Sequence, residues 1–441
     1  MSSLHRLAWG ANARAHGYPG IWRSIDAFAA MSADEARLRM GELLLRRIRY
    51  FGTRADALPE WRDAARARDA DELWALWPSL PILGKDDLRT RFDPARLIDE
   101  LGLSGVRSST GGSTGEPTPF LHDPAMRHAK SAATMYCRLR FGWRPGMPTV
   151  AVWGSERDIG RQRSWDRRLI SRARNERIID GYRLTGATVD ALLGYVAAHG
   201  SVAVSGFTSM LEYVARETLA SGRAPAPGKV VAAWNGGEML FPHQSETFSR
   251  AFGTPIRNYY AGRELSAMAY QGTSGAALRV LRPLLMVEVV DDAGRPAAAG
   301  EVGRLVWTST VCGGTPFLRY DIGDLGWAGE GDGDDSGIRA LGGLEGRRAG
   351  LVELPNGRVI HTLFWNHLFK DYAEVFQFQV AFVGGARLEL RLLGGGMSTE
   401  RVAELTATVG AFAGDIPIAV RWLDRLPRTD QGKLLQVVRE G

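Results

Sequence analysis

Apolar residues recur at helical spacing near the start of the chain, and this pattern predicts a mostly helical first hundred residues. One predicted helix is capped by Asp34, whose carboxylate suits the N-cap position. A second helix is expected over residues 60–77, because Pro78 would end it. The apolar stripe of the first helix consists of Leu38, Leu44, Leu45, Ile48 and Phe51.

Short apolar runs alternate with helical periods in the middle of the chain. The alternation is typical of an α/β layer with a largely parallel sheet. Residues 278–324 are strand-rich, with a turn at residues 292–294. The predicted strands cover residues 149–153, 201–204 and 230–234. The predicted helices cover residues 189–198 and 209–219, and an earlier one carries Ala125, Ala129, Ala132 and Tyr136 on its apolar face.

The pattern restarts after Gly346 and predicts a small α+β unit. Residues 329–337 are expected to form a loop, and Pro355-Asn356-Gly357 predicts a hairpin turn. We therefore expect a large, multilayered α/β domain over residues 1–348, helical in residues 1–75, and a small domain over residues 349–441. The small domain's expected elements are strands over residues 375–382, 386–393 and 418–422 and a helix over residues 399–412.

Composition narrows the class of protein. The 441 residues are 45% apolar and 24% charged, which is typical of a soluble globular protein. No apolar run is long enough to span a membrane, and the first residues lack the layout of a signal peptide, so we expect a cytoplasmic protein without a membrane partner. Cys137 and Cys312 exclude a disulfide framework and are expected to be buried and inert.

Charge distribution and histidine spacing argue against two further classes, namely nucleic-acid-binding proteins and proteins with a histidine-chelated metal. Basic residues exceed acidic ones by six, and arginine supplies 50 of the 55 basic residues. No basic tail or run concentrates this charge, so we do not expect a nucleic-acid partner. The pairs His122/His128 and His361/His367 are six residues apart, a spacing that does not suit chelation from one helical face.

The strongest chemical signal is the stretch Ser108-Ser109-Thr110-Gly111-Gly112-Ser113-Thr114-Gly115-Glu116-Pro117-Thr118. Its interleaved hydroxyls and glycines form a donor-rich, sterically open pattern that suits phosphate oxygens. A Walker loop would need a lysine where Glu116 stands. A hydrolase elbow would need a strand before Ser113 and a helix after it, whereas Arg107–Thr110 is polar and two prolines follow. On composition alone, a flexible surface loop stays an alternative.

The stretch resembles the Ser/Thr/Gly phosphate loop of the adenylate-forming enzymes, and seven further motifs of that family appear in order from about residue 76 onwards. Together they resemble the phenylacetate–CoA ligase-like branch of the AMP-forming acyl-CoA synthetases, which includes capsule-biosynthesis and coenzyme-F adenylating relatives. The motifs are Pro81–Leu88 (L-P-x-x-x-K-x-D-L), Gly236-Gly237-Glu238 (G-E), Asn258–Glu264 (Y-G-x-R-E), Tyr320–Asp324 (Y-x-T-G-D), Gly346-Arg347 (G-R), Phe376–Gln379 (q-F-Q) and Pro427–Lys433 (P-R-T-x-x-G-K).

The resemblance implies an enzyme that uses ATP and Mg²⁺ to convert a carboxylic acid into its acyl-AMP, with release of pyrophosphate, and then passes the acyl group to CoA. Lys433 and Glu264 would be catalytic, with Glu264 also binding Mg²⁺. Tyr260 would stack on adenine, and Asp324 would accept hydrogen bonds from the ribose. The implied ATP and AMP contacts are Ser109, Thr110, Gly111, Gly112, Ser113, Thr114, Gly115, Gly237, Glu238, Tyr259, Tyr260, Asp324 and Arg347. Tyr136, Trp153, Trp234 and Ala261 are expected to line the acyl pocket.

Three departures from the family pattern leave alternatives open. Glu116 replaces the lysine common after the loop, Ile322 replaces a threonine, and Arg348-Ala349-Gly350 lacks the aspartate often found at the hinge.

The acyl group could instead pass to an amine, or AMP to a hydroxyl. A nucleotide-binding protein without catalysis and a basic binding protein are the alternatives from other classes. We expect an aromatic or other small organic acid as substrate, and a homodimer stays open.

Overall fold

The computed structural model divides into two compact units, each built from segments that are distant in sequence. The first unit includes Phe141–Asn258 and Gly346–Gly441, and the second comprises Ala8–Arg140 and Tyr259–Glu345. The residues that the structure describes are 9–11, 13–110, 117–153, 171–172, 174–181, 184–273, 275–329, 333–334, 337–347, 352–353, 359–360, 365, 368–369, 371–414, 416–429 and 434–440, with the backbone alone at 333–334, 347, 352–353 and 359–360.

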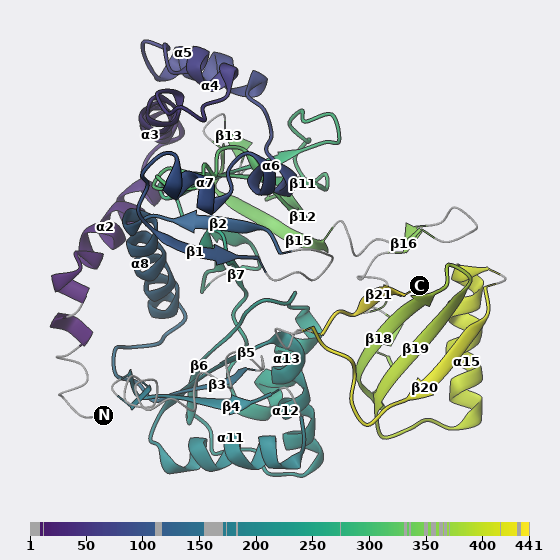
Figure 1. Ribbon diagram of the computed structural model, residues 1–441. Helices are drawn as coiled ribbons and strands as arrows, with labels where there is room; N and C mark the ends of the chain where they lie inside the picture. The colour runs from purple at the N-terminus through teal and green to yellow at the C-terminus, as the bar shows by residue number, and fades with distance from the viewer. Residues whose placement is uncertain are drawn as a thin grey trace. The chain divides into compact units, whose positions relative to one another are not determined.

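A parallel sheet forms the core of the Phe141–Asn258 segment. Among its described residues the strand order is β4-β3-β5-β6, and every pairing is parallel, as predicted. Helices α11, α12 and α13 pack around this sheet (Figure 1), so that β5 is buried along its whole length. The strands are β3 (Thr149–Trp153), β4 (Glu176–Asp180), β5 (Val202–Gly206) and β6 (Val230–Asn235), and the helices are α11 (Gly186–Ala198), α12 (Thr208–Ala220) and α13 (Pro242–Phe252).

The C-terminal segment of the first unit contains a mixed sheet in the order β20-β19-β18-β21. Helix α15 (Thr399–Ala413) covers one face through Leu405, Val409 and Ala413, all fully buried, and Ser398 caps its start. The predicted turn at Pro355-Asn356-Gly357 lies outside the described residues, between antiparallel β16 and β17. The strands are β16 (Val352–Glu353), β17 (Val359–Ile360), β18 (Val375–Val383), β19 (Arg387–Gly394), β20 (Ile418–Trp422) and β21 (Val437–Glu440).

The second unit is built on a larger sheet, whose described strands run in the order β10-β11-β12-β15-β9-β8-β7. A separate hairpin of β1 (Val106–Ser109) and β2 (Pro119–His122) leads into α8 (Pro124–Arg140), which contacts β8. The large sheet consists of β7 (Tyr259–Gly262), β8 (Ser266–Gln271), β9 (Leu278–Val280), β10 (Leu285–Val290), β11 (Gly303–Ser309), β12 (Tyr320–Ala328) and β15 (Ala340–Arg347). A short hairpin of β13 (Gly333–Asp334) and β14 (Gly337–Ile338) stands where a loop was expected.

The first hundred residues are mostly helical, but two details of the prediction are wrong. Ser32, and not Asp34, caps α3, because its hydroxyl accepts from the Glu35 backbone and the Glu35 carboxylate accepts from Ser32 in return. The helix expected over residues 60–77 is split, because Asp69 starts a new helix by capping Glu72 N at 2.9 Å. The helices are α2 (Tyr18–Ala29), α3 (Ala33–Gly52), α4 (Pro59–Ala64), α5 (Ala70–Leu76), η1 (Trp77–Ser79), α6 (Lys85–Thr90) and α7 (Pro94–Asp99).

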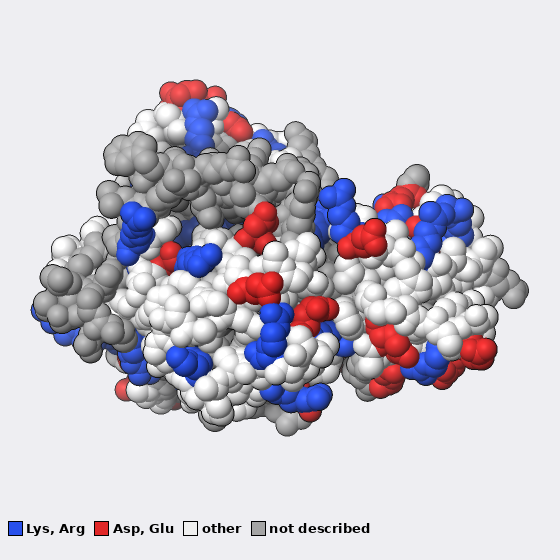
Figure 2. All heavy atoms as spheres, turned by 90° about the horizontal axis from the view of Figure 1, so that it is seen from below, with Lys and Arg blue, Asp and Glu red and all other residues white. Residues whose placement is uncertain are grey.

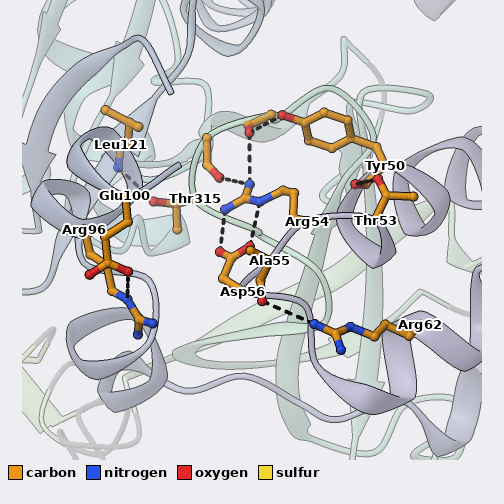
Figure 3. A network of polar contacts seen from close by, with 12 residues as sticks. Tyr50, Thr53, Arg54, Ala55, Asp56, Arg62, Arg96, Glu100, Leu121 and Thr315 are labelled. Atoms are coloured by element: carbon orange, nitrogen blue, oxygen red, sulfur yellow. Dashed lines mark hydrogen bonds and ion pairs between the residues drawn. The ribbon is translucent and has the colours of Figure 1, made fainter. Parts of the chain in front are cut away.

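Arg54 joins the N-terminal helices to a loop of the same unit (Figure 3). It makes a bidentate pair with Asp56 at 2.9 and 2.6 Å, and its Nη1 donates to the carbonyls of Gly313 and Gly314 at 3.1 and 2.7 Å. Both paired side chains are only 8% exposed. Two residues after Gly313, Thr315 exchanges two hydrogen bonds with the backbone of Leu121 on β2. The N-terminal helices therefore support the strand that follows the Ser/Thr/Gly loop.

The cysteine prediction is confirmed, since Cys137 and Cys312 are both free and buried. Burial raises the pKa of the Cys312 thiol to about 11, which keeps it protonated at neutral pH. No helix in the described part of the chain has both the length and the apolar character to cross a membrane. On the face drawn in Figure 2, basic and acidic side chains are interspersed.

Candidate active site

Two threonines close the base of the Ser/Thr/Gly loop. β1 and β2 pair antiparallel, with Ser109 opposite Pro119. Beyond this pair, Thr110 N donates to Thr118 O at 2.9 Å, and Thr118 N donates to Thr110 Oγ1 at 2.9 Å. These reciprocal bonds fix both ends of the loop. The predicted phosphate ligands that lie outside the described residues are Gly111, Gly112, Ser113, Thr114 and Gly115.

Strand β1 corrects one expectation and argues against one alternative. Its polar residues were expected to disfavour a strand, but β1 is held by β2, which buries Phe120, Leu121 and His122, while the first half of β1 is exposed to solvent. β2 also stands where a hydrolase elbow requires a helix. The geometry around the loop is therefore that of a hairpin.

Glu264 is buried in the turn between β7 and β8. It is 6% exposed, and its Oε1 accepts a long hydrogen bond of 3.5 Å from the Tyr320 hydroxyl. Its backbone carbonyl oxygen lies 2.7 Å from His122 Nε2, and Lys130 Nζ donates to the neighbouring Arg263 carbonyl at 2.6 Å. The structure thus surrounds the predicted metal ligand with polar groups from β2, α8 and β12.

The structure brings Tyr260 and Asp324 together, although they lie 64 residues apart in sequence. The Tyr260 hydroxyl donates to Asp324 Oδ2 at 2.7 Å. A carboxylate has about four lone-pair sites, so Asp324 can accept further hydrogen bonds, such as those from vicinal hydroxyls. The ring centroids of Tyr260 and Trp307 lie 5.8 Å apart, and the two rings are tilted by 58°.

The remaining residues predicted in this unit have different surroundings. The Tyr259 hydroxyl donates to Thr134 Oγ1 at 3.4 Å, and burial raises the pKa of Tyr259. Tyr136 is 4% exposed, and its hydroxyl donates to Asp26 at 2.6 Å, which links α8 to α2. Ala261 is half-buried at an irregularity in the β7–β8 pairing.

Lys85 lies against the glycine that precedes Asp324. Leu83 forms a parallel bridge with Tyr320, so the segment before the loop runs beside the start of β12. A methyl group on Gly323, whose φ is +86°, would lie 3.3 Å from Lys85 Nζ. Both the left-handed backbone and the close ammonium group favour glycine at this position.

In the first unit, Glu238 sits at the start of α12. Its carboxylate accepts from the Ser209 backbone N–H at 2.7 Å and from the Ser209 hydroxyl at 3.1 Å. The same carboxylate accepts from Leu434 N at 2.9 Å. Gly237, with φ +72°, makes the turn that brings Glu238 there. A carboxylate at a helix N-terminus is favoured by the unpaired N–H groups of the first turn.

The two predicted pocket tryptophans pack around the neighbouring strands. Trp153 stacks on Phe207 with ring centroids 4.1 Å apart, and a methyl group on Gly236 would lie 3.2 Å from its ring. Trp234 is 5% exposed and stacks on Phe141 at 6.0 Å. Trp153 therefore covers the glycine next to Gly237, whereas Trp234 belongs to the core.

Lys433 lies outside the described residues, but the segments on both sides of it are anchored. Gln379 Nε2 donates to the carbonyls of Pro427 and Leu435, at 3.3 and 3.0 Å. Arg428 donates to the Ser209 hydroxyl at 3.3 Å and to Gln377 Oε1 at 3.1 Å. Gln377 and Gln379 are both buried on β18, so this strand anchors the described segments before and after Lys433. Arg347 ends β15, and its side chain is not described.

Sequence reasoning gave no role to four residues of these clusters, namely Lys85, which stands in the Pro81–Leu88 motif, and His122, Lys130 and Ser209, which belong to no motif. The available signal was the rarity of lysine, because the chain has only five lysines among its 55 basic residues. Lys85 and Lys130 are two of them, and each lies beside a predicted site residue or its neighbour. His122 was considered only as a chelator, and no motif pointed to Ser209.

Comparisons with known proteins agree with this architecture. No known family model matches the sequence. Protein CapK of Staphylococcus aureus is 24% identical over 246 residues, which are 56% of this chain and 52% of that protein, so the match spans about half the length of this curated relative.

Solved structures that share the fold include those of two CoA ligases. One is 2-hydroxyisobutyryl-CoA ligase in the postadenylation state with R3-HIB-AMP, with a TM-score of 0.70, 18% identity and coverage of 93% of this chain and 90% of that one. The other is the anthranilate CoA ligase AuaEII with anthranoyl-AMP, with a TM-score of 0.53, 13% identity and coverage of 74% and 64%. The chain therefore has the fold of the adenylate-forming CoA ligases.

Proposed function

We propose that this protein adenylates a carboxylic acid with ATP, releases pyrophosphate and transfers the acyl group to CoA. The observation that carries the proposal is the Tyr260–Asp324 hydrogen bond in the same unit as buried Glu264 and the closed base of the Ser/Thr/Gly loop. Adenine can stack on the Tyr260 ring, and ribose hydroxyls can donate to the Asp324 carboxylate. The triphosphate needs the donors of the Ser/Thr/Gly loop, and its cation needs a carboxylate such as that of Glu264. The fold shared with CoA ligases supports the assignment.

The second unit would bind the nucleotide. Asp324 accepts from the ribose hydroxyls while Tyr260 orients its carboxylate and presents a ring face to adenine. Ser109 and Thr110 lead into the donor-rich residues 111–115, which hold the β- and γ-phosphates through hydroxyl and backbone N–H groups. Positioning and charge neutralisation then lower the barrier to in-line attack by the carboxylate on the α-phosphorus.

The first unit would supply the remaining groups. Lys433 places a compact positive charge on the carboxylate oxygen and the α-phosphate, and Arg347 donates to the ribose or phosphates. Trp153 lines the acyl pocket, and an aromatic or other small acid suits such a surface. We place the boundary between a large and a small domain after residue 348, and we assign the chain to the phenylacetate–CoA ligase-like branch.

Glu264 fits a Mg²⁺ ion because its carboxylate is buried and, among the described residues, accepts a long hydrogen bond from Tyr320 that leaves lone pairs for a cation. Among the described residues no three His, Cys, Asp or Glu side chains gather as a metal site, so further ligands would come from phosphate and water. A bound Mg²⁺ ion would neutralise negative charge on the departing pyrophosphate.

The test is an acid-dependent pyrophosphate exchange assay over a panel of carboxylic acids. Exchange with one acid, followed by loss of free CoA thiol when CoA is added, supports the proposal. Exchange with acid but no use of CoA would favour an amine as acyl acceptor. Exchange without any acid would favour AMP transfer to a hydroxyl.

Lys433→Ala tests the assignment of the catalytic lysine, and we expect exchange to fall by about a hundredfold or more, as for a contact made in the transition state. Lys229→Ala is the matched control, because Lys229 also lies in the first unit but donates to the His199 carbonyl at 2.8 Å. If both variants keep wild-type exchange, Lys433 has no part in adenylation.

A further inference from the structure

Two side chains from other elements make hydrogen-bond contacts with the turn that carries Glu264. Lys130 of α8 donates from Nζ to the Arg263 carbonyl at 2.6 Å. His122 of β2 lies with Nε2 at 2.7 Å from the Glu264 carbonyl. Two successive backbone carbonyls are therefore bonded to a lysine and a histidine that lie far from them in sequence.

The partners of His122 determine which ring nitrogen carries the proton, because the Glu264 carbonyl oxygen, 2.7 Å from Nε2, can only accept. An ammonium group has three donors and no acceptor, and Lys130 Nζ lies 3.5 Å from His122 Nδ1. Nε2 therefore carries the proton of the neutral ring and donates it to the Glu264 carbonyl, which leaves Nδ1 to accept from Lys130.

The same helix holds the far side of the turn. Thr134, one helical turn after Lys130, shares a hydrogen bond of 3.2 Å with the hydroxyl of Ser266. Ser266 has φ +70°, an unusual value for a residue with a side chain. Contacts at Arg263, Glu264 and Ser266 thus fix the backbone of the turn, and a fixed backbone fixes the direction in which the Glu264 side chain leaves it.

We propose that Lys130 and His122 are positioning residues that hold the Arg263–Glu264 turn, and thereby aim the Glu264 carboxylate at the phosphates of the nucleotide and their cation. This inference rests on the proposed function, because it assigns Glu264 to that site. A lysine suits the position better than an arginine, since a compact ammonium group can bond a carbonyl and an imidazole at once, whereas a planar guanidinium group is broader. In a chain that otherwise uses arginine, this requirement accounts for the lysine.

The direct test measures the tautomer of His122 by NMR of ¹⁵N-histidine-labelled full-length protein, with the signal assigned through His122→Gln. At pH 7 we expect a ring protonated at Nε2 and not at Nδ1. In Lys130→Met we expect the proton to stay on Nε2, because the Glu264 carbonyl only accepts, while the Nδ1 signal shifts through loss of its hydrogen bond from Lys130. A ring protonated at Nδ1 in the wild type, or a spectrum unchanged in Lys130→Met, would overturn the proposed contact.

The functional test measures the Mg²⁺ concentration that gives half-maximal pyrophosphate exchange. We expect Lys130→Met to raise it about tenfold, with the KM for the acid within twofold of wild type. His122→Gln, which keeps an N–H donor, should retain more activity than His122→Leu. Arg127→Met is the matched control, because it removes a positive charge from the same helix at an exposed site, and it should leave the Mg²⁺ dependence unchanged.

The outcomes separate the two proposals. If wild-type protein shows no acid-dependent exchange, the proposed function is wrong, while the NMR result still decides whether Lys130 donates to His122 Nδ1. If exchange occurs but Lys130→Met keeps the Mg²⁺ dependence of the wild type, the positioning role is wrong and the proposed function stands. A thermal unfolding scan of each variant shows whether a loss of activity reflects loss of the fold.

Discussion

The hydrogen bond between Tyr260 and Asp324 gives a prediction whose size follows from the structure. Tyr260→Phe removes one oxygen and keeps the ring, so any stacking on adenine is retained. The lost bond has a length of 2.7 Å and an acidic acceptor. Hydrogen bonds to charged groups contribute about 1.5–3 kcal/mol, and the half-buried setting of both residues favours the lower end. About 1.4 kcal/mol corresponds to a tenfold change in affinity, so the KM for ATP should rise about tenfold.

The assay is initial-rate pyrophosphate exchange at varied ATP and saturating acid. Tyr50→Phe is the matched control, because Tyr50 lies in the same unit and its hydroxyl donates to the neutral Gly313 carbonyl at 3.0 Å. We expect this control to stay within twofold of wild type. With 2′-deoxy-ATP the effect of Tyr260→Phe should shrink, because one ribose donor to Asp324 is missing. Equal KM values for both tyrosine variants and wild type would refute the assignment of Asp324 to the ribose.

Three further predictions concern the other polar clusters. Arg54→Met should lower the free energy of unfolding by about 3 kcal/mol or more, because it leaves Asp56 buried and unpaired, and adding Asp56→Leu should recover part of that loss in calorimetry. Glu238→Ala should lower the kcat of exchange about tenfold or more and change the KM for ATP little, because the Glu238 carboxylate accepts from the backbone N–H of Leu434, next to Lys433. A raised KM for ATP with an unchanged kcat would instead make Glu238 a nucleotide contact. His122 is held neutral with its pKa lowered from 6.5 to about 4, so the unfolded chain binds its proton more tightly and stability should rise by up to about 3 kcal/mol between pH 4 and pH 6.5. His122→Leu should flatten that rise in pH-dependent urea titrations.

Strong apolar periods made much of the fold predictable. The strands over residues 149–153 and 418–422 were predicted with their observed bounds, because both are short, mostly apolar runs. The single helix predicted over residues 60–77 was wrong. The apolar pattern continues across the point where Asp69 caps a new helix, so the pattern alone does not show the break. β1 was missed because its exposed, polar residues form a strand only through their partner β2.

The site was predictable only where a motif exists. Tyr260 and Asp324 were both named from motifs, but their direct hydrogen bond joins residues that the sequence separates widely. Lys130 and His122 belong to no motif, and only the packing of α8 and β2 against the β7–β8 turn gives them a role. Glu238 was assigned to the nucleotide, and its contacts with Ser209 and Leu434 could not be read from its G-E motif.

The discontinuous build of the two units has a consequence for biosynthesis. The second unit starts at Ala8, but its large sheet needs residues up to Glu345. At about 5–20 residues per second, a ribosome takes roughly 10–40 s to travel from residue 140 to residue 345. Strands β3 to β6 and their helices, in contrast, come from one continuous stretch of chain. We therefore expect the parallel sheet to fold first on the nascent chain, while the helices that were synthesised before it still await their partners.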